Sequence, residues 1–407
     1  MLKKWYAKLL VLLAVVCAVA AAHPAAQAEA IPEETEQTQT EAIPEETAQE
    51  QSEDDVTIIA SGTCGAEGDG SNLRWELDSN GTLSISGSGA MKDYRYNSWS
   101  TRWNGYGDRI KSLTIASGIT KIGNYAFYDC SGLTSITLPE GLTSIGSLAF
   151  FECTGLTSVA FPDGLTSIDR LAFQDCTGLT SVTFPAGLTS IGEFAFSGCS
   201  GLTSLAFPDS LTNISESAFK GCTGLTSVTL PTGLTWINRY VFQDCTSLTS
   251  VTLPNGLTGI GDFAFSGCSG LSNISFPETL QYIDDEAFYL CSFSKITIPA
   301  SVTHIGLYGL YCGTSGGTDI YFSGNAPVVT AADGVKPSFS ADSTLYFDLE
   351  KTGWIDSSYY DCSTGKWNGY KTSPRREQNV RTNRRANTAQ VSRKTTSRHR
   401  PKSGCAG

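Results

Sequence analysis

Cysteine is the residue type with the most potential chemistry in this chain of 407 residues, which contains 13 cysteines. Thiols can form disulfides, bind zinc or act as nucleophiles. The chain has no C-x-x-C pair and no cysteine at ligand spacing from a histidine, so we expect no metal site. Eight cysteines recur every 23 residues: Cys130, Cys153, Cys176, Cys199, Cys222, Cys245, Cys268 and Cys291. This spacing indicates an internal repeat rather than separate reactive sites.

Histidines and acidic turns suggest little further chemistry. Beyond the N-terminal segment only His304 and His399 remain, and His304 takes a position that serine fills in earlier repeats. Nucleophilic catalysis needs a base beside the nucleophile, so we expect no catalytic residues and no enzyme. Glu67-Gly-Asp69 and Asp284-Asp285-Glu286 could each attract a hard cation. Solvated turns are the favoured interpretation of both, and we expect no cofactor.

The element that positions the cysteines is a repeated unit with its own apolar pattern. The unit from Leu133 to Cys153 reads LTSITLPEGLTSIGSLAFFEC. Ile136 and Leu138 alternate with polar neighbours, as in a short strand with one buried face, and the proline that follows ends the strand. The apolar spacing after Leu142 predicts a tight turn or a 3₁₀-like return limb.

One such unit cannot be stable alone. It offers about five or six large apolar side chains at roughly 2 kcal/mol each, whereas ordering its backbone costs roughly 1–2 kcal/mol per residue. Stacking of units must supply the difference. We therefore predict a leucine-rich repeat solenoid over residues 110–312, with eight rungs and a degenerate ninth.

Within such a solenoid the cysteines form a column. Neighbouring strands lie about 4.8 Å apart, which is within the Cα range of a disulfide, but parallel side chains have the wrong direction for bridging. The favoured prediction is a column of buried free thiols that act as small apolar fillers. Bridges formed in an oxidising compartment remain an alternative. No pairing can be assigned to Cys64, Cys312, Cys362 and Cys405.

The repeat resembles that of the BspA-like leucine-rich repeat proteins of bacteria. The shared pattern is L-T-S-[IV]-x-[LF]-P-x-x-L-T-x-I-x-x-x-A-F-x-x-C, which recurs eight times over residues 110–312, and the likeness extends to Ala60–Gly65 and Trp367–Tyr370. The resemblance implies a secreted or surface-displayed bacterial protein, with adhesion to host matrix proteins or co-aggregation as its role. Because the motif is structural, it implies no catalytic residues.

The N-terminal region predicts export. Three lysines, an apolar run from Leu9 to Ala22 and the small-x-small sequence Ala26-Gln-Ala28 form a signal peptide over residues 1–28. Residues 29–55 hold eleven acidic and no basic residues, which predicts a disordered linker. We expect a secreted or cell-surface protein without a transmembrane segment in the mature chain.

The C-terminal region has the opposite charge. Residues 371–407 hold eleven Lys or Arg and one Glu, within a chain of net charge −12. A disordered basic tail is the favoured interpretation; attraction to anionic wall polymer, membrane or nucleic acid, and a reading-frame artefact, are the alternatives. Without aromatic residues for stacking, we expect no specific nucleic-acid recognition.

Small β-rich caps are predicted at both ends of the solenoid. The sequence Asp78-Ser-Asn-Gly81 lies between two alternating segments, which predicts a hairpin in an N-terminal cap over residues 56–109. Residues 319–322 and 344–347 are strand-like and predict a C-terminal cap over residues 313–370.

Candidate binding residues lie where the repeats differ. The outward strand positions are nearly uniform, as in Ser135 and Thr137, and offer few hot-spot residues. The variation precedes each Ala-Phe pair, where charged and aromatic residues gather. The candidate ligand-binding residues are Trp236, Arg239, Tyr240, Arg170, Phe194 and Phe263. Trp236, Arg239 and Tyr240 are the strongest candidates, and ordinary solvated turns are the alternative.

These patterns predict a non-enzymatic secreted or surface module that binds an extracellular protein, matrix component or glycan. The alternative is a structural spacer or envelope component that its basic tail holds to anionic wall polymer.

Overall fold

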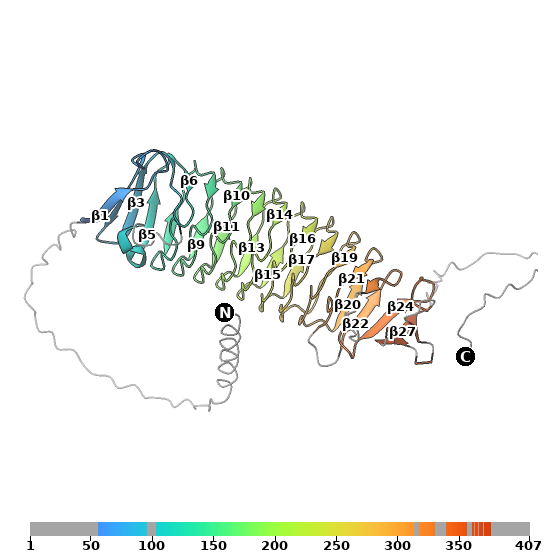
Figure 1. The fold of residues 1–407 in the computed structure, drawn as a ribbon. Helices are drawn as coiled ribbons and strands as arrows, with labels where there is room; N and C mark the ends of the chain where they lie inside the picture. Colours follow the sequence, from blue (N-terminus) through green and yellow to red (C-terminus); the bar gives the residue numbers. More distant parts are fainter. Residues whose placement is uncertain are drawn as a thin grey trace, which may run out of the picture. The chain divides into compact units, whose positions relative to one another are not determined.

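The computed structural model describes residues 56–95, 103–312, 317–329 and 339–355 and, between 360 and 375, all but 362, 365 and 369. These residues belong to one compact unit, Asp55–Gly407. The predicted signal peptide and acidic linker, almost all of the basic tail, and Cys362 and Cys405 lie outside the described residues. The described chain is the predicted leucine-rich repeat solenoid, with successive rungs stacked side by side (Figure 1).

All rungs but the one at residues 273–275 contribute a short strand to a first row of parallel strands. Its side chains alternate between exposed and buried, as in β9, where only the middle residue is buried. The outward serine and threonine positions predicted as uniform are exposed. The row comprises β5 (Ser112–Ile115), β7 (Ser135–Thr137), β9 (Ser158–Ala160), β11 (Ser181–Thr183), β13 (Ser204–Ala206), β15 (Ser227–Thr229), β17 (Ser250–Thr252), β20 (Lys295–Ile298), β22 (Asp319–Phe322) and β24 (Thr344–Asp348).

A second row of parallel strands follows the proline turn of each rung. The sequence pattern predicts only a tight turn or a 3₁₀-like limb there, because two-residue strands are too short to show an alternating pattern. The row comprises β4 (Gly89–Ala90), β6 (Ile119–Ile122), β8 (Ser144–Ile145), β10 (Ser167–Ile168), β12 (Ser190–Ile191), β14 (Asn213–Ile214), β16 (Trp236–Ile237), β18 (Gly259–Ile260), β19 (Tyr282–Ile283), β21 (His304–Ile305) and β23 (Val328–Val329).

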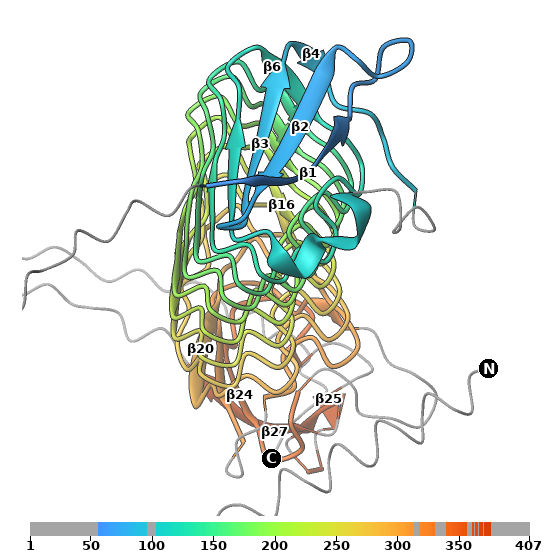
Figure 2. The same ribbon diagram turned by 90° about the vertical axis from the view of Figure 1, so that its left-hand side faces the viewer.

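The third side of each rung, here called the turn limb, is the return segment that ends at the periodic cysteine. Of the two predicted forms, tight turns and 3₁₀ helix, the rungs use turns. Bonds within the limb, such as Cys130 N–H to Phe127 O at 3.2 Å, alternate with bonds to the next rung, such as Phe127 N–H to Ala149 O at 2.7 Å. The limb therefore pairs with its neighbours much as a strand does, and Figure 2 shows successive rungs as parallel copies, each displaced from the one before.

The solenoid begins on an antiparallel hairpin, as its Asn-Gly turn predicts. Strands β2 (Leu73–Asp78) and β3 (Thr82–Gly87) pair antiparallel. On its other edge β3 pairs in parallel with β5, so the hairpin leads directly into the first row. The remaining N-terminal elements are β1 (Ile58–Thr63) and the 3₁₀ helices η1 (Trp103–Gly105) and η2 (Gly107–Arg109).

At the other end the first row continues past the ninth rung. Strands β22 and β24 add to β20 in parallel, and β27 (Tyr370–Arg375) pairs in parallel with β24. Strand β26 (Lys366–Trp367) then turns back antiparallel between β25 (Tyr360–Asp361) and β27. The predicted strand segments of this region thus extend the solenoid before the antiparallel strands end it.

The core is a set of columns, of which the phenylalanine column is the largest. Its eight rings, from Phe127 to Phe288, are fully buried. Neighbouring ring centroids lie 5.0–5.8 Å apart, with planes within 18° of parallel. The indole of Trp103 extends the stack onto Phe127 at 5.3 Å and donates to Ala126 O at 2.7 Å. Identical rings stack because each rung repeats its neighbour at a constant rise.

The cysteine column lies beside the phenylalanine column. All ten described cysteines are buried and unbridged, as the favoured prediction stated. From Cys153 to Cys291, each thiol also donates to the phenylalanine carbonyl 26 residues earlier, at 3.1–3.3 Å. The thiols are therefore hydrogen-bond donors as well as apolar fillers. Burial raises the pKa of Cys222 to about 12, so the thiol stays protonated and can donate.

Candidate binding surface

The turn limb carries two columns of side chains on its outer side. The minus-five column holds the residue five positions before each periodic cysteine, and the minus-two column holds the residue two positions before it. Most of these side chains are half-buried. The minus-five column comprises Tyr125, Leu148, Leu171, Phe194, Ser217, Tyr240, Phe263 and Glu286; the minus-two column comprises Tyr128, Phe151, Gln174, Ser197, Lys220, Gln243, Ser266 and Tyr289.

The minus-five residues have an unusual backbone. Their φ angles lie between 53° and 62°, in the left-handed region that bulky side chains rarely adopt. Every rung shares this conformation whatever its side chain, so it belongs to the fold rather than to a binding site. It directs the N–H group to the next rung, as where Tyr240 donates to Asp262 O at 3.0 Å.

Three of the predicted binding residues come together on this surface. The Tyr240 ring stacks on Phe263 with centroids 4.9 Å apart. The Arg239 guanidinium lies 5.3 Å from the centre of the Tyr240 ring, and its Nε is 3.1 Å from Asp262 Oδ2. Lys220, which the sequence analysis did not select, brings its Nζ to 5.7 Å from the same ring. The cluster of Arg239, Tyr240 and Phe263 is here called the aromatic patch.

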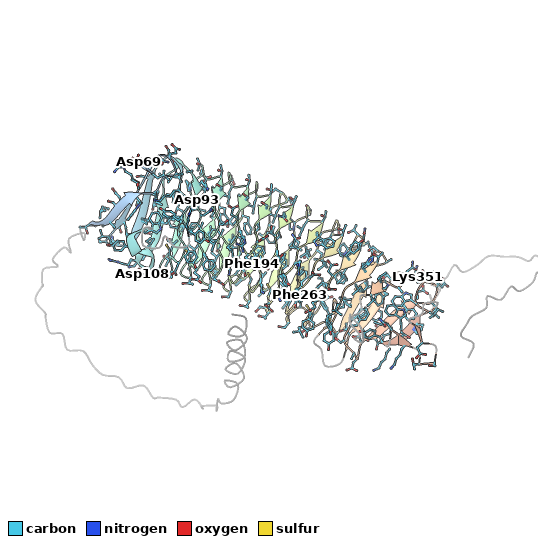
Figure 3. All side chains as sticks on the ribbon, in the orientation of Figure 1. Asp69, Asp93, Asp108, Phe194, Phe263 and Lys351 are labelled. Atoms are coloured by element: carbon cyan, nitrogen blue, oxygen red, sulfur yellow. The ribbon has the colours of Figure 1, made fainter. Side chains whose placement is uncertain are left out.

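Two further predicted residues form an equivalent site three rungs earlier. Arg170 and Phe194 have the same offsets from their cysteines as Arg239 and Phe263. Arg170 Nε lies 3.2 Å from Glu193 Oε2, which repeats the ion pair of Arg239 with Asp262. Leu171 stands where the later rung has Tyr240, so this site lacks the aromatic stack. Phe194 and Phe263 lie on the same side of the solenoid (Figure 3).

Trp236 belongs to a different surface. It lies on β16 in the second strand row, and its ring occupies the space above Gly259, where an added Cβ would lie 1.9 Å from the indole. The indole then meets Tyr282 at 6.1 Å, and Tyr282 stacks on His304 at 5.1 Å. Trp236 thus starts an aromatic stripe along the second row rather than joining Tyr240. Aligning the residue before each second-row isoleucine would have revealed this stripe in the sequence.

Further aromatic groups, which were not selected from the sequence, lie on the turn-limb side near both ends of the solenoid. Near the N-terminal end, Tyr128 stacks on Phe151 at 4.8 Å. Near the C-terminal end, Tyr289 lies 5.6 Å from Tyr311, and Tyr308 lies 5.5 Å from Tyr311. The available signal was a shared offset of two positions before the periodic cysteine for Tyr128, Phe151 and Tyr289; Tyr308 and Tyr311, four and one positions before Cys312, do not keep it. The aromatic patch is therefore one of several aromatic clusters on this side.

The acidic turn Asp284-Asp285-Glu286 stabilises the stacking of rungs. Asp285 Oδ1 accepts from Leu307 N–H at 2.6 Å, and Asp262 Oδ1 accepts from Asp285 N–H at 3.2 Å. Asp284 replaces the glycine found at this position in several rungs. Partial burial, together with the nearby charges of Asp262 and Asp285, raises its pKa to about 6.

Metal-ligating side chains are scattered in the described part of the chain. No three His, Cys, Asp or Glu side chains gather there in a way that could hold a metal ion. His304 Nδ1 lies 2.8 Å from Thr303 Oγ1, its own chain neighbour. Nor does any helix among these residues have the length and apolar character of a membrane span.

Comparison with known proteins identifies the repeat. A family model described as the BspA type leucine rich repeat region (6 copies) matches residues 106–213 and 189–314, which together exceed half of the chain. A comparison with curated proteins gives no match.

Several solved structures of bacterial proteins are similar. A leucine-rich repeat protein of T. pallidum is 28% identical over 51% of this chain and 91% of that chain, with a TM-score of 0.40. One from Bacteroides ovatus is 22% identical over 74% and 75%, with a TM-score of 0.46. A leucine rich cell surface protein of Faecalibacterium prausnitzii is 22% identical over 65% and 95%, with a TM-score of 0.30. The family match, together with the stacked 23-residue rungs, shows that the chain belongs to the BspA-type leucine-rich repeat family.

Proposed function

We propose that the chain is a non-enzymatic, exported binding module whose turn limb contacts a protein of the extracellular matrix or of another cell surface. The predicted signal peptide supports export, and the family scaffold is consistent with protein binding. The single observation that carries the choice of surface is the aromatic patch. Arginine and tyrosine in mutual contact are typical of interface hot spots.

The parts of a rung differ in how freely their side chains can vary. The interior columns must match their neighbours, because a changed volume leaves a cavity or a clash. The side chains of the minus-five and minus-two columns are mostly half-buried, so they can change at less cost to the stack than the interior columns. Specificity in such a scaffold is therefore expected on the variable surface, where Tyr240 and Phe263 are half-buried and Arg239 is exposed.

The equivalent site around Arg170 provides a matched experiment. Tyr240→Leu gives the aromatic patch the same three residue types as Arg170, Leu171 and Phe194. The ion pair and the backbone are retained. Immobilised matrix proteins and wall glycans are offered to the full mature chain, and captured partners are then titrated. We expect Tyr240→Leu to weaken binding of the captured protein roughly tenfold or more, equivalent to about 1.4 kcal/mol. Arg170→Ala should leave binding unchanged; unchanged binding by Tyr240→Leu would contradict the choice of surface.

A second candidate function is a structural component of the envelope that its basic tail holds to anionic wall polymer. The eleven basic residues of 371–407 favour it. Retention on isolated cell walls is compared for the full chain and a chain ending at Tyr370. Equal retention would count against the tail, whereas salt-sensitive loss on truncation would support it.

A further inference from the structure

The aromatic stripe of the second strand row is formed by Trp236, Tyr282 and His304. Earlier rungs have serine at this register position, as in Ser144, Ser167 and Ser190. From β16 onward the position is occupied in turn by Trp236, Gly259, Tyr282, His304 and Val328. Val328, at the end of this series, is 62% exposed. Over these rungs the row therefore changes from small polar side chains to large rings and an exposed apolar group.

Gly259 provides the space in which the indole of Trp236 lies. A Cβ added to Gly259 would be 1.9, 2.3 and 2.4 Å from Cζ3, Cε3 and Cη2 of the indole. Because these three bonded atoms are at similar distances from that point, the ring lies over the glycine with a face, rather than an edge, toward the main chain. The opposite face is directed away from the sheet, and Trp236 is partly exposed.

The Tyr282 ring completes a corner beside this indole. The two ring planes meet at 43°, with centroids 6.1 Å apart. On its other side Tyr282 stacks on His304 at 5.1 Å, which holds the phenol ring in place. The rings of Trp236 and Tyr282 are here called the aromatic corner.

Three carboxyl groups border the aromatic corner and are here called the acidic edge: Asp284, Asp285 and Glu286. Asp284 directly follows β19, the strand that carries Tyr282. Burial raises the pKa of Asp284 most, Asp262 and Asp285 raise it further, and His304 lowers it. The Asp284 carboxyl therefore lies within electrostatic reach of the stripe.

The charge of the acidic edge is not balanced by a basic side chain. None of the ion pairs among the described residues involves Asp284, Asp285 or Glu286. The nearby Arg239 is already paired with Asp262 at 3.1 Å. The aromatic corner thus lies beside negative charge that a cation from outside the described structure could neutralise.

The repeat does not require Trp236 or Asp284. Serine occupies the Trp236 position in three earlier rungs, and several rungs have glycine where this one has Asp284, as in Gly192 and Gly261. With a pKa of about 6, the ionised Asp284 carboxyl is less favourable in the folded chain than in the unfolded chain. Departures from a repeat that reduce stability are typical of functional positions.

We propose that the aromatic corner and the acidic edge bind an arginine-bearing segment of a partner polypeptide. Indole attracts cations more strongly than the other aromatic side chains. A guanidinium group is planar, so it can stack on the outer face of Trp236 and donate hydrogen bonds to Asp284 at the same time. The acidic edge would repel an acidic partner. This surface lies in the second strand row, so the inference goes beyond the proposed function at the aromatic patch and can fail separately from it.

Three matched peptides test the chemistry of the partner. The probe is a glycine- and serine-rich peptide with two arginines; in the second peptide citrulline, the neutral isostere, replaces arginine, and in the third lysine does. Binding to the full mature chain is measured by titration calorimetry at pH 7.5 and low ionic strength. We expect the citrulline peptide to bind at least tenfold more weakly than the arginine peptide, and the lysine peptide several-fold more weakly. No binding of the arginine peptide, or equal binding of either replacement, would overturn the proposal.

Variants of the chain test the site itself. Trp236→Ser introduces the residue of the earlier rungs and should weaken binding of the arginine peptide about tenfold. Gly259→Ser keeps the indole but fills its space, and should weaken binding similarly. Ser167→Gly is the matched control at the same register position and should leave binding unchanged. Equal binding by Trp236→Ser and the unaltered chain would refute the site.

Asp284→Asn separates binding from folding. It removes a charge that disfavours the folded chain, so a several-fold loss of affinity should occur without a loss of stability. Tyr240→Leu, in the aromatic patch, should leave binding of the arginine peptide unchanged. Weaker binding by Tyr240→Leu together with full binding by Trp236→Ser would assign the peptide to the turn limb and contradict the proposal.

The basic tail of the chain is the competing occupant. Replacement of the Lys and Arg residues beyond Arg375 by glutamine should leave the affinity for the arginine peptide unchanged. A gain of tenfold or more would show that the tail occupies the aromatic corner, and would overturn the assignment of this surface to a partner polypeptide.

Discussion

Phe194 and Phe196 are two residues apart in one rung and have opposite situations. Phe196 is fully buried between Phe173 and Phe219, with ring centroids 5.3 and 5.5 Å away. Phe194 is half-buried on the turn limb, in a backbone conformation set by the fold. At the position of Phe196 the eight rungs from Phe127 to Phe288 all have phenylalanine. At the position of Phe194 they have tyrosine, leucine, phenylalanine, serine or glutamate. The interior columns determine the fold, and the outer columns are free to acquire a binding surface.

Truncation of both rings should give the largest difference between the two positions. Phe196→Ala leaves a cavity in the stack and should destabilise the chain by about 3–5 kcal/mol. Phe194→Ala should change stability by no more than about 0.5 kcal/mol. Urea denaturation followed by circular dichroism measures both. Similar losses for the two variants would contradict the division into interior and outer columns.

The cysteine column tests whether the interior depends on volume alone. Cys222 Sγ donates to Phe196 O at 3.3 Å. If this bond matters, Cys222→Ser should be more stable than Cys222→Ala by about 0.5–1.5 kcal/mol, the usual net value of one hydrogen bond. If the thiol only fills space, Cys222→Ala should be the more stable variant, because burying a hydroxyl group costs more free energy than burying a methyl group.

The reactivity of the thiols provides an independent measurement. With burial raising the pKa of both Cys222 and Cys268 to about 12, neither thiol ionises near neutral pH. In the folded chain they should resist a thiol reagent at pH 8, and urea should expose them together. Rapid labelling of the folded chain at either residue would contradict the burial of the column.

The smallest expected effect concerns a carboxyl group on the outer side. The pKa of Asp284 is raised from 3.8 to about 6, so the folded state holds its proton more tightly than the unfolded state. This group should therefore lower stability above pH 6, and the penalty should fade as the pH falls from about 6 toward 4. Asp284→Asn should raise the urea midpoint at pH 7.5 and have little effect at pH 4. A gain that is equal at both pH values would exclude titration as its cause.

The sequence predicted the fold because the repeat fixes local structure and stacking at once. The strands with alternating side chains, the hairpin at Asn80-Gly81 and the buried cysteines are confirmed. The second strand row was not foreseen, because two residues such as Ser144 and Ile145 carry no period. Thiol donation to the phenylalanine carbonyls was also missed, because it joins residues 26 positions apart through the stack rather than along a strand.

The candidate surface was predicted only in part. Residue type and offset selected Arg239, Tyr240 and Phe263, which do meet. The same reasoning placed Trp236 with them, although its indole lies over Gly259 toward Tyr282. Neighbours in the chain can face different sides of a rung, and the side is set by backbone turns that periodicity does not report.

The solenoid, its period and the identity of the columns follow from the sequence alone, because apolar side chains that recur every 23 residues can be buried only by stacking. Which outer side chains touch and which thiols donate depends on the tertiary structure. These outcomes depend on contacts between residues about 23 positions apart, and such contacts exist only after one rung has been laid against the next.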